Sequence, residues 1–185
     1  VGTCLLTWWT GRLLAGPLVG LLSGLVMSTC IWTGVGGRAA TPDASLVFCT
    51  TLAAAIYVHA IHQRGALTRR HALGIGLACG LAILAKGPVG IVLPMLAFLL
   101  TALVLRQKST PIDGRSWLYT TAVSLRPLTI VSVATLVALP WYLLVGLRTN
   151  GQWITDFLLI HNAGRFAAPM EGHSGSFLYY PMVLA

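Results

Sequence analysis

Side chains that could take part in binding or catalysis gather in three short segments of an otherwise apolar chain. Residues 37–43 read Gly-Arg-Ala-Ala-Thr-Pro-Asp and hold a cation close to a carboxylate. Residues 86–88 read Lys-Gly-Pro, so a lysine precedes two residues that break helices. Residues 148–176 form a polar stretch that carries His161, Asn162, Arg165, Glu171 and His173. Cations next to free backbone N–H groups favour phosphate binding.

Lys86 is the main candidate for binding an anion. The uncharged run before it predicts a helix over residues 72–85, which would rise only ~21 Å. The hydrocarbon core of a bilayer is about 30 Å thick, so we expect Lys86 at or below the outer lipid boundary. Gly87 and Pro88 would break the helix there and expose N–H groups beside the ammonium. The alternative is a turn lysine that reaches the interface and binds no ligand.

Asp43 is the candidate catalytic carboxylate. Thr41-Pro42-Asp43 places an acid in the first turn of a helix, where the helix dipole stabilises it by ~0.3–1 kcal/mol. Thr41 is the expected N-cap. Arg38 is close enough in sequence to pair with Asp43 or with an anionic ligand. A purely capping role is the alternative for Asp43.

Residues 153–160 are expected to lie on the membrane surface. Trp153, Phe157 and neighbouring aliphatic residues form one apolar face of this segment. A helix in that position would deliver His161, Asn162 and Arg165 to the outer headgroup layer. The alternative is a solvated loop with an aromatic anchor.

The elements that must position these residues are transmembrane helices. Of the 185 residues, 56% are hydrophobic and only 9% are charged, whereas soluble domains carry about 25% charged residues. Lipid must therefore solvate most of the surface, and the net charge of +8 is spread between spans rather than gathered for nucleic acid. Uncharged runs of about 20 residues predict one all-α transmembrane helix bundle with helices at 13–33, 44–63, 72–85, 89–105 and 128–147, partial helices at 1–11 and 177–185, and an outward loop at 148–176.

The distribution of charge between the connecting segments predicts the orientation. If the helices alternate, Arg12, residues 64–71 and residues 106–126 lie on one side, which is rich in basic residues. The positive-inside rule makes that side cytoplasmic. Arg38, Asp43, Lys86, Arg148 and Arg165 then share the outward side.

Small residues recur at helical spacing in two of the expected helices. Gly16, Gly20, Gly24 and Ser28 form one stripe, and Gly76 and Gly80 form another. Such stripes let helix backbones approach closely. We expect packing within the chain rather than a dimer contact.

Several classes of function lack their sequence signals. The chain has no Walker P-loop for ATP-driven transport. The four cysteines form no CxxC pair, and His59 and His62 are expected to be interfacial side chains rather than metal ligands. No metal site is predicted from these residues.

Five blocks in the chain together resemble the bacterial membrane glycosyltransferases related to aminoarabinose transferase of lipid A and to dolichyl-phosphate-mannose protein mannosyltransferase. The blocks, in order, are Gly37–Ala44, Ala85–Val89, Leu139–Tyr142, His161–Phe166 and Glu171–Tyr180. Each block alone is weak, but the ordered series covers nearly the whole chain.

The resemblance implies a C-type glycosyltransferase fold in a multi-pass protein of the bacterial inner (plasma) membrane. Such enzymes move a sugar from a polyprenyl phosphate carrier to an acceptor lipid, protein or glycan on the outer side. By resemblance, Lys86 and Arg165 are candidates for the carrier phosphate, and Asp43 is a carboxylate that faces the same cavity. The residues expected to help shape the phosphate pocket are His161, Asn162, His173 and Arg38. The sugar, the acceptor and a divalent metal requirement stay open.

The resemblance also implies that one functional part lies outside this chain. The principal catalytic acid of the family lies in the first outward loop, and no block of this chain matches that loop. We therefore expect part of the carrier site here, and a fragment that is inactive alone. The alternatives are a transporter or flippase of polyprenyl-linked sugars, and an inactive remnant or scaffold.

Overall fold

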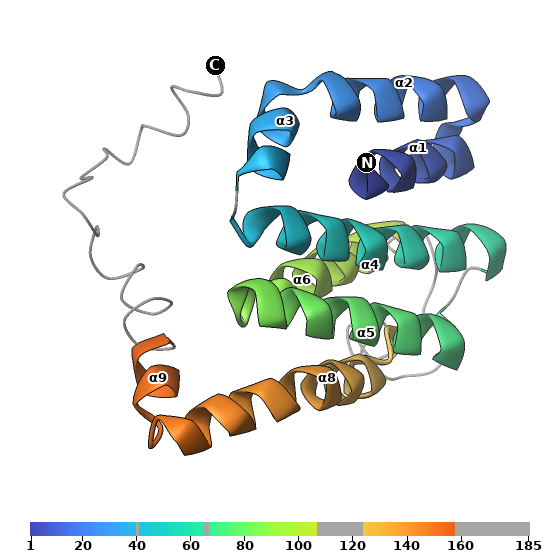
Figure 1. Cartoon of the computed structure of the whole chain (residues 1–185). Helices are drawn as coiled ribbons and strands as arrows, with labels where there is room; N and C mark the ends of the chain where they lie inside the picture. Colours follow the sequence, from blue (N-terminus) through green and yellow to red (C-terminus); the bar gives the residue numbers. More distant parts are fainter. Residues whose placement is uncertain (40, 65–66, 107–123, 158–185) are drawn as a thin grey trace, which may run out of the picture. The chain divides into compact units, whose positions relative to one another are not determined.

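The computed structural model describes residues 1–39, 41–64, 67–106 and 124–157, and these form helices joined by short turns (Figure 1). No strand occurs within these ranges, so the predicted all-α class is confirmed. The helices are α1 (Gly2–Ala15), α2 (Pro17–Thr29), α3 (Ile31–Arg38), α4 (Asp43–Arg64), α5 (Arg69–Lys86), α6 (Val89–Arg106), α8 (Pro127–Arg148) and α9 (Gln152–Thr155). The chain divides into two compact units, Val1–Pro140 and Trp141–Ala185.

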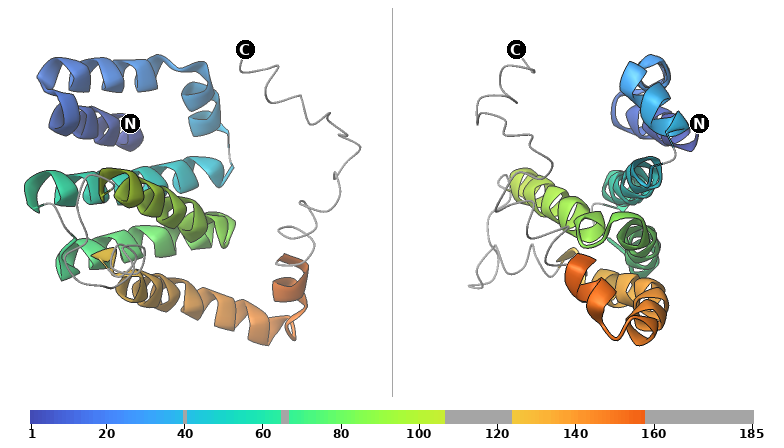
Figure 2. Two further views of the ribbon diagram at one scale, coloured as in Figure 1. Left: turned by 180° about the vertical axis from the view of Figure 1, so that it is seen from behind. Right: turned by 60° about the vertical axis from the view of Figure 1, so that its left-hand side comes forward.

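A hairpin of α1 and α2 opens the first unit (Figure 2). Gly16 makes the turn with φ 92°, and Pro17 begins α2 at a position where its missing N–H costs nothing. A Cβ at Gly20 would lie 2.7 Å from the carbonyl oxygen of Trp8, and one at Gly24 would lie 2.9 Å from Trp8 Cβ. Glycine therefore permits the close approach of the two helices, as the small-residue stripe predicts.

The hairpin corrects the helix expected at 13–33. That range begins inside α1 and is broken at Gly16 and again at Cys30, whose φ −63° and ψ 121° are extended. The helix expected at 1–11 in fact continues to Ala15. Gly-Pro and an extended cysteine interrupt a helix without adding charge. The length of an uncharged run therefore does not reveal these two breaks.

Three helices, α4, α5 and α6, form the centre of the first unit (Figures 1 and 2). Their observed bounds match the expected 44–63 and 89–105 within one residue at each end, but α5 begins at Arg69 rather than at 72. Thr68 caps α5, since its hydroxyl accepts a hydrogen bond from the His71 N–H at 3.4 Å. The cap allows two basic residues to join the first turn. The uncharged run therefore underestimates the length of the helix.

Close packing of α8 against α5 completes the unit. A Cβ at Gly76 would lie 2.7 Å from Val133 Cβ, and a Cβ at Gly80 would lie 2.7 Å from Val137 Cβ. The fully buried Ile130 of α8 joins the same core. The second glycine stripe is therefore also used for packing within the chain.

Among the residues that the structure describes, two helices are long and apolar enough to cross a membrane. These are Asp43–Gln63 and Pro127–Arg148, with mean hydropathies of 1.8 and 2.1. Only 28% and 17% of their apolar windows are buried, which is unlike the core helix of a soluble protein. Residues 17–29 and 89–104 are apolar but shorter. These helices agree with an all-α membrane bundle.

Candidate functional site

The structure brings together two of the predicted site residues, Asp43 and Lys86. Lys86 Nζ donates a hydrogen bond to Asp43 Oδ1, and the two groups form an ion pair. Asp43 begins α4 and Lys86 ends α5, and the antiparallel course of these helices places both at the same end (Figure 1). The side chains are 48% and 42% exposed, so the pair is accessible to a ligand.

The turn after Lys86 differs from the expected cluster of free donors. The Gly87 N–H donates to the carbonyl of Ile83 at 2.7 Å, and Pro88 has no N–H. Gly87 has φ 77°, and a Cβ at Gly90 would lie 2.4 Å from the carbonyl carbon of Ala82. The turn is therefore a tight connection between α5 and α6, and the Lys86 ammonium is the cation beside it.

The observed length of α5 corrects the argument about depth. α5 has 18 residues and rises ~27 Å, close to the ~30 Å thickness of the hydrocarbon core. A helix of that length does not force its last residue below the lipid boundary. Accessibility of Lys86 therefore follows from its half-exposed side chain and not from a short helix.

The first turn of α4 also carries one wall of an apolar groove of about 900 Å³. Its lining comes from the start of α1, the end of α2, α3 and the start of α4. The lining residues are Val1, Gly2, Thr3, Cys4, Met27, Thr33, Val35, Gly36, Gly37, Ala39, Thr41, Asp43, Ala44, Val47 and Phe48. Asp43 is the one charged side chain in that described lining. The groove and the ion pair therefore share a single carboxylate.

Asp43 belongs to the first sequence block and Lys86 to the second, and the ion pair brings these two blocks together. Residues 1–141 of the chain match the family described as dolichyl-phosphate-mannose-protein mannosyltransferase. The chain belongs to this family. No solved structure matches it.

Curated proteins similar to this family member come from several bacteria. It is 30% identical to an undecaprenyl phosphate-alpha-4-amino-4-deoxy-L-arabinose arabinosyl transferase of Pectobacterium carotovorum over 98% of the chain. It is 31% identical to a protein of the same name from Aeromonas salmonicida over 97% of the chain. An uncharacterised protein of Aquifex aeolicus is 29% identical over 89%. The chain spans 31% of the length of each of the first two relatives.

Arg38 lies close in sequence to the pair but does not take the expected partner. It ends α3 with an exposed side chain. Within the described residues, the ion pair of Asp43 is with Lys86. A role of Arg38 toward an anionic ligand stays a prediction.

Four other predicted site residues lie in the part of the chain that the structure does not describe. His161, Asn162, Arg165 and His173 lie outside the described residues, as do the blocks that contain them. Just before them, Trp153 stacks on Phe157 at 4.9 Å between ring centroids, and Tyr142 lies 6.0 Å from Trp153. Asn150 and Gly151, with φ 48° and 82°, turn the chain from α8 into α9. The aromatic cluster is local to the second unit, and its place at the membrane surface stays a prediction.

Sequence reasoning missed a second cluster, at the other end of α4. The ring of His59 lies 5.1 Å from Trp9 and 6.0 Å from His71 between centroids. Within the described ranges, the buried Nδ1 of His59 has no hydrogen-bond partner. In the part of the chain that the structure describes, no three His, Cys, Asp or Glu residues are placed to share a metal ion. The sequence signal available for this cluster was the occurrence of Trp9, His59 and His71 near the ends of three different helices.

Proposed function

We propose that this family member takes part in moving a sugar from a polyprenyl phosphate carrier to an acceptor on the outer side of the membrane. The observation that carries the proposal is the accessible Asp43–Lys86 pair at one end of an apolar helix bundle. The similar proteins from Pectobacterium and Aeromonas are named for an undecaprenyl phosphate-linked sugar, which is a donor of this class. The end that carries the pair is the outward end in the orientation proposed from charge.

Lys86 is proposed to bind the phosphate of the carrier. A phosphate oxygen and a carboxylate oxygen compete for the same ammonium, and charge-assisted hydrogen bonds of both kinds are roughly twice as strong as neutral ones. Because the pair is half exposed, an arriving phosphate can replace Asp43 without unfolding the turn. Arg165, His161, Asn162, His173 and Arg38 are proposed to complete the phosphate pocket.

Replacement of Asp43 by a phosphate at Lys86 would free the Asp43 carboxylate for another role. A carboxylate that has lost its ammonium partner is available to accept hydrogen bonds from the sugar or from an acceptor hydroxyl. We propose Asp43 as this second carboxylate of the site. The principal catalytic acid implied by the family resemblance has no counterpart among the five sequence blocks. The 185-residue chain alone is therefore expected to give no turnover.

The experiment compares Lys86→Ala with Arg70→Ala in the full-length protein. Arg70 is an exposed cation in the first turn of the same helix, at its opposite end. We expect Lys86→Ala to lower kcat/KM for the polyprenyl phosphate sugar ~100-fold, the equivalent of about 2.7 kcal/mol. Arg70→Ala should stay within about twofold of the natural protein. Equal rates and equal donor affinities for Lys86→Ala and the natural protein would exclude the phosphate role.

A further inference from the structure

The groove beside Asp43 has one wall that differs from the others. The α3 helix forms this wall with Thr33, Val35, Gly36 and Gly37, whereas the other walls come from longer helices. Figure 1 shows α3 leaving the end of α2 and leading down to the start of α4. α3 is therefore the short element that encloses an apolar space at this end of the unit.

Weak internal stability sets α3 apart. Its eight residues include Gly34, Gly36 and Gly37, and each glycine costs roughly 1 kcal/mol of helix stability relative to alanine. A Cβ at any of the three would meet nothing within 4 Å, so close packing does not require these glycines. Extended residues flank the helix, with ψ 121° at Cys30 and ψ 135° at Ala39. The glycines thus leave open space on α3 rather than filling it with side chains.

The apolar lining predicts the nature of the group that enters. A volume of about 900 Å³ lies within the ~300–1,000 Å³ typical of small-molecule sites. Valine, methionine and phenylalanine line it, and lipid is the solvent around an apolar bundle of this kind. A hydrocarbon chain from the surrounding bilayer is the group available at the highest concentration.

The charges at the groove predict the headgroup. Asp43 contributes a carboxylate to the lining, and Lys86 adds an ammonium next to it. A headgroup that carries both an ammonium and a phosphate can pair with both members at once. A headgroup with only a negative charge would gain Lys86 but would leave Asp43 without a cation.

We propose that the groove holds one acyl chain of a zwitterionic phospholipid, with the headgroup ammonium at Asp43 and the headgroup phosphate at Lys86. Phosphatidylethanolamine has this chemistry. The binding does not depend on glycosyl transfer, because it uses only the groove and the resting ion pair. It does predict that the phospholipid and the carrier phosphate compete for Lys86.

The test is native mass spectrometry of the full-length protein. The protein is placed in nanodiscs that contain equal amounts of phosphatidylethanolamine and phosphatidylglycerol, released into mild detergent, and weighed with its retained lipids. We expect one retained phosphatidylethanolamine per protein. Retention of phosphatidylglycerol to the same extent, or of no phospholipid, would overturn the proposal.

Two matched variants locate the lipid. Gly36 lines the groove and Gly34 does not, although both lie on α3 and both have open space around a new Cβ. Gly36→Phe should fill the groove and reduce lipid retention at least tenfold, whereas Gly34→Phe should retain the lipid. The same retention in both variants, with matching thermal midpoints, would overturn the groove as the site.

A third variant tests the headgroup. Asp43→Asn removes the charge that selects the ammonium and should abolish the preference for phosphatidylethanolamine over phosphatidylglycerol. An unchanged preference would overturn the assignment of Asp43. These readouts are lipid masses and not transfer rates, so failure here and failure of the proposed glycosyl transfer can be told apart.

Discussion

The two ends of α4 use their polar side chains in different ways. At the Asp43 end, which comprises α3, the start of α4 and the end of α5, an ion pair is half exposed beside an apolar groove. At the His59 end, rings of three helices pack together and a threonine caps α5. Charged residues occur at both ends, so charge alone does not distinguish a site from a connection.

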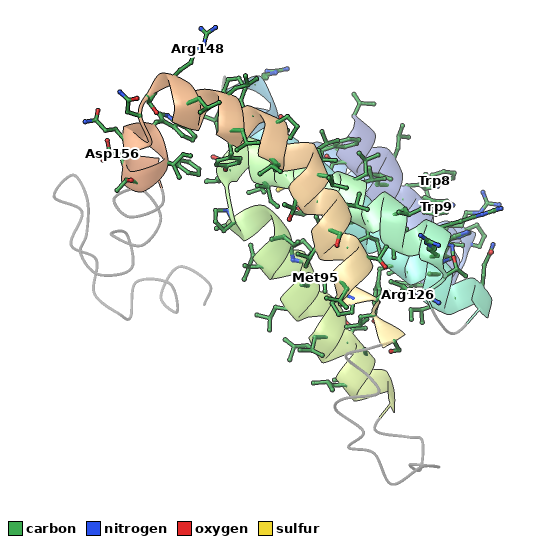
Figure 3. The ribbon with its side chains drawn as sticks, turned by 90° about the horizontal axis from the view of Figure 1, so that it is seen from below. Trp8, Trp9, Met95, Arg126, Arg148 and Asp156 are labelled. Carbon is green, nitrogen blue, oxygen red and sulfur yellow. The ribbon has the colours of Figure 1, made fainter. Side chains whose placement is uncertain are left out.

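The His59 end shows how cations become structural. The Arg12 guanidinium lies 5.7 Å from the centre of the Trp8 ring, a distance that permits a cation–π contact. Arg126, labelled in Figure 3, directly precedes α8. Its Nε donates to the Leu67 carbonyl at 3.1 Å and so connects the start of α8 to the turn before α5. Each of these cations has a partner within the fold. At the Asp43 end, by contrast, Arg38 is exposed and Lys86 pairs with a carboxylate that is half exposed.

The largest expected effect on stability contrasts two kinds of glycine. A Cβ added at Gly80 would lie only 2.7 Å from Val137 Cβ, and the rest of a leucine side chain would need still more space. Overpacking by Gly80→Leu should therefore cost about 1–3 kcal/mol of stability. The thermal midpoint in detergent should fall by several degrees. Gly34→Leu, in open space on α3, is the control and should leave the midpoint nearly unchanged. Equal midpoints for the two variants would contradict the close packing of α5 against α8.

A smaller effect is expected at Arg126, which has φ 52°. Arg126→Ala loses the hydrogen bond to Leu67, worth ~1 kcal/mol, and keeps an unfavourable backbone conformation. Arg126→Gly loses the same bond but adopts positive φ without strain. Thermal unfolding should therefore rank the natural protein first, Arg126→Gly second and Arg126→Ala last. An alanine variant at least as stable as the glycine variant would show that the backbone here is not strained.

The smallest expected effect is at His59. His59→Phe keeps a ring against Trp9 and removes a buried nitrogen that has no hydrogen-bond partner among the described residues. Stability should rise by up to about 1 kcal/mol, or stay the same, because no hydrogen bond is lost. His59→Ala is the matched control, since it removes the ring contact and should destabilise the protein. Clear destabilisation by His59→Phe would mean that the nitrogen has a partner.

The sequence anticipated the long helices better than the short ones. α4, α6 and α8 agree with expectation within one residue at each end, because charged residues bound an apolar run that is as long as the span. The turn at Gly16 and the break at Cys30 lie inside apolar sequence, where hydropathy does not change. The start of α5 was missed because a Thr68 cap lets basic residues enter the helix.

The candidate site was anticipated in its members but not in its contacts. Spacing and topology predicted Asp43 and Lys86 on the same side of the bundle. Their pairing depends on how α4 and α5 rotate about their own axes, which residue spacing does not determine. The groove was missed for a related reason, because it exists only where α3 turns away from α2 at Cys30.

The measurement that tests the account most directly is a charge exchange, Asp43→Lys combined with Lys86→Asp, in the full-length protein. The exchange keeps an ion pair at the Asp43 end but moves the ammonium from the end of α5 to the start of α4. In the folded exchange variant, we predict a loss of donor affinity and of transfer comparable to Lys86→Ala. Transfer at the natural rate would contradict the account, since the pair would then serve only to hold α4 and α5 together.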